Sequence, residues 1–254
     1  MASIGLAVEE GNAVVSLQRP PLNILNHEMV QELSQMLDNL SREPAVRTVT
    51  LASGIPGVFS AGADVKEHLP PMARTLIEGF VGLCRKLFSY PKPTLALVDG
   101  KCLGGGMEVA MVCAFVLASE RSVFGQPEVA VGVFPPVGAA LYPLLAGVRN
   151  AHRVLLSGAS FDARESLSMG YVTEVVPQAD LASARTRWLQ NFSGRSGVVL
   201  RLSKRAVLQG LGQPWETALS SATDLYLGEL MSSADAVEGL RAFTEKRKPQ
   251  WKEL

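Results

Sequence analysis

The sequence predicts an α/β fold made of repeated ββα units, followed by a helical C-terminal region. Strand patterns rich in alternating and β-branched residues are separated by stretches of helical periodicity. The strands are short and their intervals uneven, unlike those of a doubly wound nucleotide-binding fold. From about Gln178 the strand patterns stop and helical patterns continue. These observations favour a coiled ββα arrangement with a helical C-terminal part.

The chain is predicted to open with a β-hairpin, whose strands at 6–9 and 13–17 are joined by the turn Glu10-Gly11-Asn12. The spacing of apolar residues then predicts a series of elements: a helix over 27–40, a strand over 46–51, a helix over 72–88, a strand over 94–98, a short helix after Gly106 and a strand over 115–118. We therefore expect an α/β core over residues 1–177.

The C-terminal region, residues 178–254, is predicted to be helical. Helical spacing recurs at 182–192, 198–211 and 233–246. No low-complexity linker separates this region from the core. We therefore expect it to pack on the core or on a neighbouring subunit.

Composition limits the possible functions. The chain has 254 residues, of which 47% are hydrophobic and 19% charged, as in a globular domain with a real core. Lys and Arg total 24, as do Asp and Glu, so no net charge attracts nucleic acid or an anionic membrane. The N-terminal residues lack an export signal and the apolar runs are too short to span a bilayer, so we expect a cytoplasmic protein. Three cysteines without a CxxC pair favour neither disulfides nor zinc.

The first segment that could support chemistry is Phe59-Ser60-Ala61-Gly62-Ala63-Asp64, which follows a predicted strand. Its small side chains leave backbone N–H groups uncovered, so the turn can donate hydrogen bonds to a ligand oxygen. An ordinary tight loop is the structural alternative. Ser60 is not expected to be a hydrolase nucleophile, because the chain has no GxSxG motif and no nearby histidine to serve as its base. His68 is expected on a surface loop.

The second segment is the glycine run Gly104-Gly105-Gly106, which follows a strand and opens an apolar helix. A helix N-terminus offers unpaired N–H groups and a partial positive charge, which suit a developing oxyanion. The spacing matches neither GxGxxG nor a P-loop, which argues against a dinucleotide or ATP site. Glu108 lies in the first turn of this helix, where a capping role is the structural alternative.

The third segment is Phe124-Gly125-Gln126-Pro127-Glu128, a short strand and turn that presents one carboxylate among apolar residues. Partial desolvation should favour the protonated form of Glu128. A structural hydrogen bond is the alternative role. Two carboxylates in different environments can nevertheless differ in protonation, so that one acts as acid while the other acts as base.

Taken in order, the three segments resemble the motifs of the enoyl-CoA hydratase/isomerase (crotonase) family. The interval from Glu108 to Glu128 (128 − 108 = 20) is the spacing that hydratases of this family show between their catalytic glutamates. The resemblance covers essentially the whole chain. It implies a crotonase-like spiral of ββα turns and a helical C-terminal trimerisation region, assembled as a homotrimer or a dimer of trimers.

The resemblance also implies roles for individual residues. Backbone N–H groups of Ala63 and Gly105 would hold the thioester oxygen of an acyl-CoA. Glu108 would deprotonate or orient the water that attacks the β-carbon, and Glu128 would deliver a proton to the α-carbon. Coenzyme A is part of the substrate and would lie along the following residues, the last two from a neighbouring subunit: Leu22, Ile24, Ala61, Asp64, Phe243 and Lys246. The resemblance implies no metal and no separate cofactor.

Addition of water to an enoyl-CoA is the favoured activity, because isomerases, thioesterases, dehalogenases and decarboxylases of the family generally differ at one or both glutamates. The alternative from another class is a non-catalytic acyl-CoA- or RNA-binding protein on the same fold. Basic residues between Arg185 and Arg205 could form a nucleic-acid patch. The zero net charge and the helical spacing instead favour a solvated helix face.

One departure from the family pattern concerns the substrate. Pro136 stands where straight-chain hydratases typically have a glycine whose N–H helps to hold the catalytic water, and proline has no N–H. Proline also suits the first turn of a helix, so a stiffer helix start is the structural alternative. Together with residues 64–70, this segment is similar to cyclic dienoyl-CoA hydratases. Cyclohexa-1,5-diene-1-carbonyl-CoA is therefore an alternative substrate.

Overall fold

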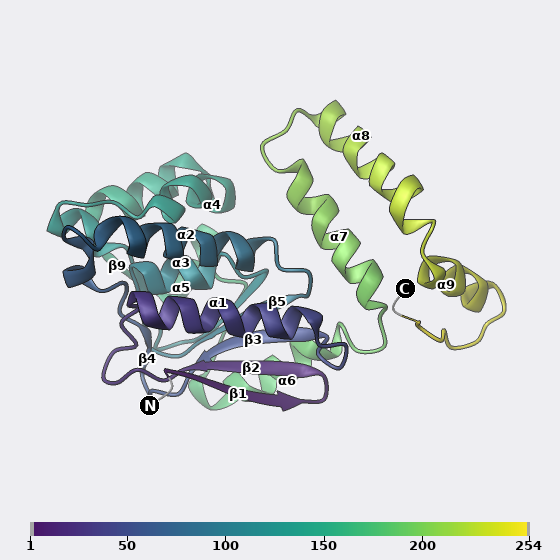
Figure 1. The fold of residues 1–254 in the computed structure, drawn as a ribbon, viewed down its shortest axis with the longest axis horizontal. Helices are drawn as coiled ribbons and strands as arrows, with labels where there is room; N and C mark the ends of the chain where they lie inside the picture. The colour runs from purple at the N-terminus through teal and green to yellow at the C-terminus, as the bar shows by residue number, and fades with distance from the viewer. Residues whose placement is uncertain (1–2, 253–254) are drawn as a thin grey trace. The chain divides into compact units, whose positions relative to one another are not determined.

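The computed structural model describes residues 3–252 (Figure 1). The chain forms two compact units. Unit 1 comprises the residues up to Tyr90 together with Thr94–Leu189, and unit 2 comprises Pro91–Pro93 and the residues from Gln190 onward. Within residues 3–252 no helix is both long enough and apolar enough to cross a bilayer.

Unit 1 is built on a larger and a smaller β-sheet. The strand order of the larger sheet is β1 (Ile4–Glu9), β2 (Asn12–Leu17), β3 (Thr48–Ser53), β5 (Thr94–Val98), β7 (Phe115–Ser119) and β10 (Glu174–Val176). The strand order of the smaller sheet is β4 (Val58–Ser60), β6 (Lys101–Leu103), β8 (Val123–Gly125) and β9 (Ser160–Asp162). The pairs β1/β2 and β8/β9 are antiparallel, and the other neighbours are parallel.

From β3 to β8, successive strands alternate between the two sheets. β3 and β4 are followed by α2 (Ala73–Phe88), β5 and β6 by α3 (Gly105–Met111), and β7 and β8 by α4 (Pro136–Ser157). Each turn of the chain therefore adds one strand to each sheet and then a helix. This arrangement confirms the predicted spiral of ββα units.

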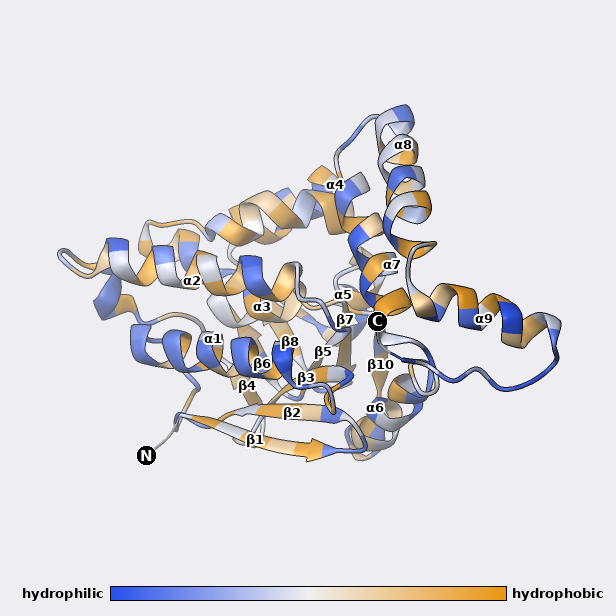
Figure 2. Cartoon of the chain, turned by 45° about the vertical axis from the view of Figure 1, so that its right-hand side comes forward, coloured by the Kyte–Doolittle hydropathy of each residue, from blue (hydrophilic) through white to orange (hydrophobic). Residues whose placement is uncertain are grey.

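Local sequence explains how the first helix covers the sheets. Helix α1 (His27–Arg42) begins at Asn26, whose side chain accepts a hydrogen bond from the Met29 N–H at 3.1 Å. Met29, Leu33 and Leu37 follow at helical spacing and are buried. The outer face of α1 is hydrophilic (Figure 2), and α1 lies beside α2 (Figure 1).

The sequence located the long elements better than the short ones. The strand predicted over 94–98 is β5, whereas the strand predicted over 46–51 begins and ends two residues later, as β3 (Thr48–Ser53). The three-residue strands β6 and β9 were not predicted, because three residues are too few to show alternation. Glu128, expected on a strand and turn, lies in the 3₁₀ helix η2 (Pro127–Val131).

The helical patterns predicted from Gln178 onward correspond to helices in both units. Helix α6 (Leu181–Gln190) packs through Leu181 and Ala184 against Leu95 and Leu117 of the larger sheet, so it belongs with unit 1. Unit 2 contains α7 (Gly197–Gly210), α8 (Trp215–Leu225) and α9 (Ala234–Thr244), of which α8 was not predicted. The division at residues 177 and 178 stays a prediction.

A small core and a buried carboxylate stabilise unit 2. Val198, Leu202 and Leu225 form its apolar centre. Asp235 is fully buried and accepts hydrogen bonds from the Ser196 hydroxyl at 2.6 Å and the Lys252 N–H at 2.7 Å. This carboxylate therefore ties the start of α7 to the chain that follows α9.

Candidate active site

The three motif segments lie at one edge of the smaller sheet. β4, β6 and β8 are parallel neighbours, so their carboxyl ends meet at the same edge. Ala63 follows β4, Gly105 follows β6 and Glu128 follows β8. The topology thus brings together residues that are far apart in the sequence.

The backbone N–H groups of Ala63 and Gly105 lie close together. Ala63 forms a parallel bridge with Leu25, in which the Leu25 N–H donates to the Gly62 carbonyl (2.9 Å) and the Asp64 N–H donates to the Leu25 carbonyl (3.0 Å). The Ala63 N–H therefore points away from that bridge. Gly105 is the first residue of α3, where N–H groups lack an intrahelical acceptor.

Neither N–H donates a hydrogen bond to another described residue. A Cβ built on Gly105 would lie 3.3 Å from the Ala63 nitrogen, which shows how closely the two segments approach. The arrangement can therefore direct two donors at a single ligand oxygen.

Gly104 fits this edge because it has no side chain. Its φ of +53° is in the region that favours glycine, and a Cβ there would lie 2.8 Å from the Glu128 Oε1. The Gly104 N–H donates to the Gly125 carbonyl at 2.9 Å, which links the second and third motifs. A bare backbone thus allows the Glu128 carboxylate to lie against the glycine run.

Glu108 is on α3 and is only 3% exposed. Its Oε1 accepts a hydrogen bond from the Gly138 N–H at 2.7 Å. Burial raises the pKa of Glu108 to about 7, the Gly138 hydrogen bond opposes this rise, and the charge of Glu128 adds to it. Glu108 can therefore exchange a proton near neutral pH.

Glu128 is less buried than Glu108 and has different neighbours. Burial raises its pKa, whereas its own backbone N–H and the positive charge of His68 favour the ionised form. The Gln126 side-chain amide lies between Glu128 and the Tyr142 hydroxyl. Because a carboxylate only accepts, the amide is oriented with its nitrogen toward Glu128, 2.9 and 3.0 Å from the two oxygens, and with its oxygen accepting from the Tyr142 hydroxyl. Glu108 and Glu128 therefore lie in different environments, so that one can act as an acid while the other acts as a base.

Four of the residues predicted to contact coenzyme A lie together in unit 1. The Ala61 N–H donates to the Leu22 carbonyl at 3.0 Å, and Ile24 precedes the residue that bridges to Ala63. The Asp64 side chain accepts from the Lys66 N–H at 3.0 Å and begins the 3₁₀ helix η1 (Val65–His68).

The other two predicted coenzyme A residues are in unit 2, at the end of α9. Phe243 is 84% exposed, and Lys246 has a φ of +54° just beyond the helix. The predicted contact residues are thus divided between the units.

Sequence reasoning missed three contributors to this site. Tyr142 and Gly138 both lie on α4, within an apolar pattern that gives no sign of contact with the motifs. His68 was expected on a surface loop. It is instead half-buried on η1, with its Nδ1 2.8 Å from the Asp64 carbonyl oxygen, and its charge acts on Glu128.

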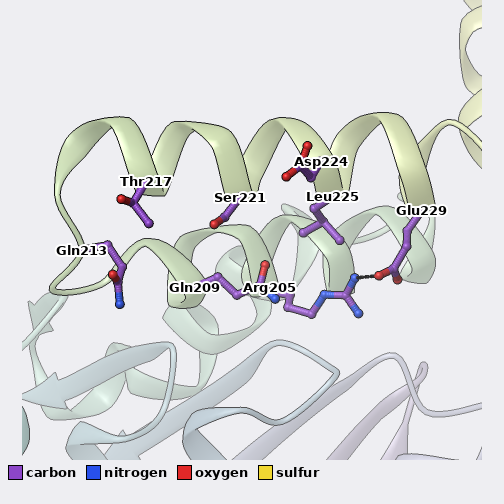
Figure 3. Close-up of a pocket in the computed structure, with 8 residues that line it drawn as sticks. All are labelled: Arg205, Gln209, Gln213, Thr217, Ser221, Asp224, Leu225 and Glu229. Atoms are coloured by element: carbon purple, nitrogen blue, oxygen red, sulfur yellow. Dashed lines mark ion pairs between the residues drawn. The ribbon is translucent and has the colours of Figure 1, made fainter.

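A separate pocket lies between α7 and α8 in unit 2 (Figure 3). It is lined by Arg205, Gln209, Gln213, Thr217, Ser221, Asp224, Leu225 and Glu229. Arg205 and Glu229 form an ion pair at its rim. None of the predicted site residues lines this pocket. Its lining is mostly polar, as in an ordinary solvent-filled groove.

The enoyl-CoA hydratase/isomerase family model matches residues 7–254 of the chain. The chain belongs to this family. It is 38% identical to the cyclohexa-1,5-dienecarbonyl-CoA hydratase of Thauera aromatica over 236 residues, which cover 92% of this chain and 90% of the relative. It is 33% identical to a probable enoyl-CoA hydratase of Bacillus subtilis over 264 residues, which cover 99% of each chain.

Solved structures of the family agree with the fold. The crystal structure of an enoyl-CoA hydratase from Bacillus anthracis superposes with a TM-score of 0.92 at 28% identity, covering 99% of this chain and 100% of that one. A second, from Geobacillus kaustophilus, superposes with a TM-score of 0.90 at 31% identity, covering 99% and 98%. The crotonase-like fold expected from the three motifs is therefore confirmed.

Proposed function

We propose that the protein adds water across the α,β double bond of an enoyl-CoA thioester, with Glu108 and Glu128 as its acid–base pair. Membership of the family supports hydro-lyase activity on acyl-CoA thioesters. The observation that supports these particular residues is the convergence of two carboxylates and two unpaired N–H groups at one sheet edge.

The N–H groups of Ala63 and Gly105 form the oxyanion hole in this proposal. They donate to the thioester oxygen, where negative charge develops as electron density leaves the double bond. The α3 N-terminus adds a partial positive charge at the same place. Each such donor stabilises a transition state by about 2.7–4 kcal/mol. The β-carbon becomes electrophilic as a result.

The two glutamates then complete the addition. Glu108 takes a proton from the water whose oxygen bonds to the β-carbon, and Glu128 gives its proton to the α-carbon. One carboxyl gains a proton while the other loses one, so the pair keeps a single shared proton. Dehydration uses the same steps in reverse. This mechanism requires no metal and no separate cofactor.

We propose that coenzyme A lies along Leu22, Ile24, Ala61 and Asp64, with Phe243 and Lys246 contributed by a neighbouring subunit. Backbone groups at the first four positions lie beside the proposed oxyanion hole. Hydrophobic positions recur along the helices of unit 2 (Figure 2). Large side chains there are exposed, among them Trp215 at 72% and Phe243 at 84%. Exposed apolar surface of this kind favours association with another chain. The family resemblance favours a homotrimer or a dimer of trimers.

A cyclic dienoyl-CoA such as cyclohexa-1,5-diene-1-carbonyl-CoA is the second candidate substrate. The similarity to the Thauera aromatica hydratase and Pro136 at the start of α4 support it. Similarity to the Bacillus subtilis enoyl-CoA hydratase supports the general substrate class. A cytoplasmic location stays a prediction.

A spectrophotometric panel of straight-chain and alicyclic enoyl-CoA thioesters tests the proposal. We expect loss of the conjugated thioester absorbance with at least one of them. If the protein binds acyl-CoA or RNA but hydrates none of the panel, the non-catalytic alternative replaces the enzyme. The relative kcat/KM values assign the substrate class.

A further inference from the structure

Gln126 connects Glu128 to a residue that the proposed mechanism does not use. Gln126 is fully buried, and its amide N–H groups donate to both Glu128 oxygens, at 2.9 and 3.0 Å. Its amide oxygen accepts a hydrogen bond from the hydroxyl of Tyr142, which is fully buried on α4. The three side chains form a chain of hydrogen bonds that ends on a proposed acid–base residue.

Chemistry fixes the direction of these hydrogen bonds. Once Glu128 has given up its proton, its carboxylate can only accept, so the Gln126 NH2 group must face Glu128 and the amide oxygen must face Tyr142. Burial raises the pKa of Tyr142 well above its ordinary value, so the hydroxyl stays protonated and donates. The Tyr142 hydroxyl therefore selects the orientation in which the amide nitrogen faces both oxygens of the carboxylate.

Two other titratable groups interact electrostatically with Glu128, namely Glu108 on α3 and His68 on η1. The Glu128 charge raises the pKa of Glu108, and the His68 charge favours the ionised form of Glu128. Neither forms a hydrogen bond with Glu128 within residues 3–252, so neither orients its carboxylate. The Gln126 amide contacts both oxygens and is suited to that role.

We propose that Tyr142 is a positioning residue for hydration, which holds the Gln126 amide in one orientation and thereby orients Glu128 and stabilises the carboxylate that forms as Glu128 gives its proton to the α-carbon. This inference rests on the proposed function. Without the hydroxyl, the Gln126 amide oxygen loses its donor and the amide is free to turn. A turned amide places its oxygen against Glu128, which favours the protonated carboxyl.

Tyr142→Phe tests this inference because it removes the hydroxyl and keeps the ring. Tyr171→Phe is its matched control, since the Tyr171 ring packs against Tyr142 at 5.1 Å between centroids and its buried hydroxyl has no hydrogen-bond partner in the described part of the chain. For Tyr142→Phe we expect kcat to fall about tenfold, with KM within about twofold, because a hydrogen bond that supports a charged group is lost.

The pH profile gives a readout that a purely structural role would not change. In Tyr142→Phe, the limb of the pH profile of kcat/KM that reports Glu128 should move to higher pH by roughly one unit, because the ionised form of Glu128 loses its hydrogen bond from Gln126. Tyr171→Phe should keep the wild-type profile. An unchanged profile in Tyr142→Phe, or an equal shift in both variants, would overturn the inference.

A double variant tests whether Tyr142 acts through Gln126. Gln126→Leu removes the connecting amide, so we expect Gln126→Leu with Tyr142→Phe to be no slower than Gln126→Leu alone. Fully additive losses in kcat would show that Tyr142 acts by another route and would reject the inference.

Nuclear magnetic resonance separates this inference from the proposed function. The side-chain amide signals of Gln126 should change in Tyr142→Phe and stay unchanged in Tyr171→Phe, with no substrate present. If the wild-type protein hydrates no enoyl-CoA, the proposed function fails while these signals still test the hydrogen-bond chain. Unchanged Gln126 signals in Tyr142→Phe would contradict the chain itself.

Discussion

The backbone N–H of Gly138 donates a 2.7 Å hydrogen bond to the Oε1 of Glu108, across 30 positions of the sequence. Gly138 lies in the first turn of α4, where N–H groups have no intrahelical acceptor and favour an anion. Pro136 opens that turn at a position where an N–H is not needed. The first turn of α4 therefore holds the Glu108 carboxylate through backbone hydrogen bonds from Gly138 and Val137.

This geometry predicts the effect of neutralising either carboxylate. Glu108→Gln and Glu128→Gln should each lower kcat by at least about 10²-fold, because general acid–base steps contribute about 10²–10⁴-fold. Affinity for coenzyme A should change little, because neither side chain is proposed to contact it. Steady-state kinetics and calorimetry with a saturated acyl-CoA measure the two effects.

The control for these variants is Glu120→Gln, which changes an exposed carboxylate outside the site. It should retain wild-type kinetics. Turnover near the wild-type rate in either Glu108→Gln or Glu128→Gln would reject the two-glutamate mechanism.

Burial of Glu108 also predicts how stability depends on pH. The pKa of Glu108 is raised from 4.5 to about 7 in the folded protein. Between these values the unfolded chain has lost the proton that the folded protein retains, so rising pH favours unfolding. Glu108 therefore lowers the free energy of unfolding progressively as pH rises through this window, and the loss is complete above about pH 7.

Glu108→Gln should remove this loss. The difference in free energy of unfolding between the variant and the wild type should therefore shift in favour of the variant by about 2–3 kcal/mol as pH rises from about 5 to about 8, since one pKa unit corresponds to about 1.4 kcal/mol. Urea unfolding of both proteins at the two pH values measures it. If the free energies of unfolding of Glu108→Gln and the wild type differ by the same amount at both pH values, Glu108 does not titrate in this window.

Gly104→Ala should damage catalysis more than a comparable change elsewhere. The new Cβ would lie 2.8 Å from the Glu128 Oε1, so the carboxylate must move. Displacement of a reacting group by about 1 Å can cost about 10²-fold in rate, and we expect a loss of this order in kcat/KM.

Gly57→Ala is the matched control for Gly104→Ala. Gly57 also has a positive φ, of +74°, but a Cβ there meets nothing within 4 Å. Both variants should lose some stability from the strained backbone, as measured by thermal unfolding. Equal activity losses in the two variants would show that strain, rather than displacement of Glu128, is responsible.

The elements and motifs that the sequence predicted well are each encoded by contiguous residues. The strand at β5 and the helices α1 and α2 show clear periodicity, and the three motifs are unbroken runs of small residues beside a glutamate. The structure brings Ala63, Gly105, Glu108 and Glu128 to one edge, and their catalytic roles stay predictions. The link from Tyr142 through Gln126 to Glu128 could not be predicted, because it depends on how α4 packs against η2.

The exposed apolar side chains of unit 2 predict an oligomer. We expect a trimer or hexamer by light scattering at micromolar concentration, because large exposed side chains such as Phe243 and Trp215 are costly to leave in water. Glu or Arg substitutions at such positions should weaken assembly. A fully active monomer would contradict both the oligomer and the proposed coenzyme A contact from a neighbouring subunit.

The last prediction concerns the shape of the substrate. Pro136 gives no N–H at the start of α4, and the nearby Gly138 N–H is occupied by Glu108, so these two positions offer no free N–H to a water molecule. We therefore expect the water to be held by the glutamates. This difference from the straight-chain pattern, with the similarity to the Thauera aromatica hydratase, favours a cyclic acyl group.

A cyclic dienoyl-CoA should accordingly be hydrated with a higher kcat/KM than crotonyl-CoA. Pro136→Gly should narrow the difference, because it restores an N–H near the attacking water, and Pro135→Ala, which changes the neighbouring proline, serves as its control. Competition between the two thioesters for one enzyme sample measures the ratio directly. A preference of the wild type for crotonyl-CoA by tenfold or more, which corresponds to about 1.4 kcal/mol of transition-state discrimination, would reject the cyclic substrate and leave the straight-chain class.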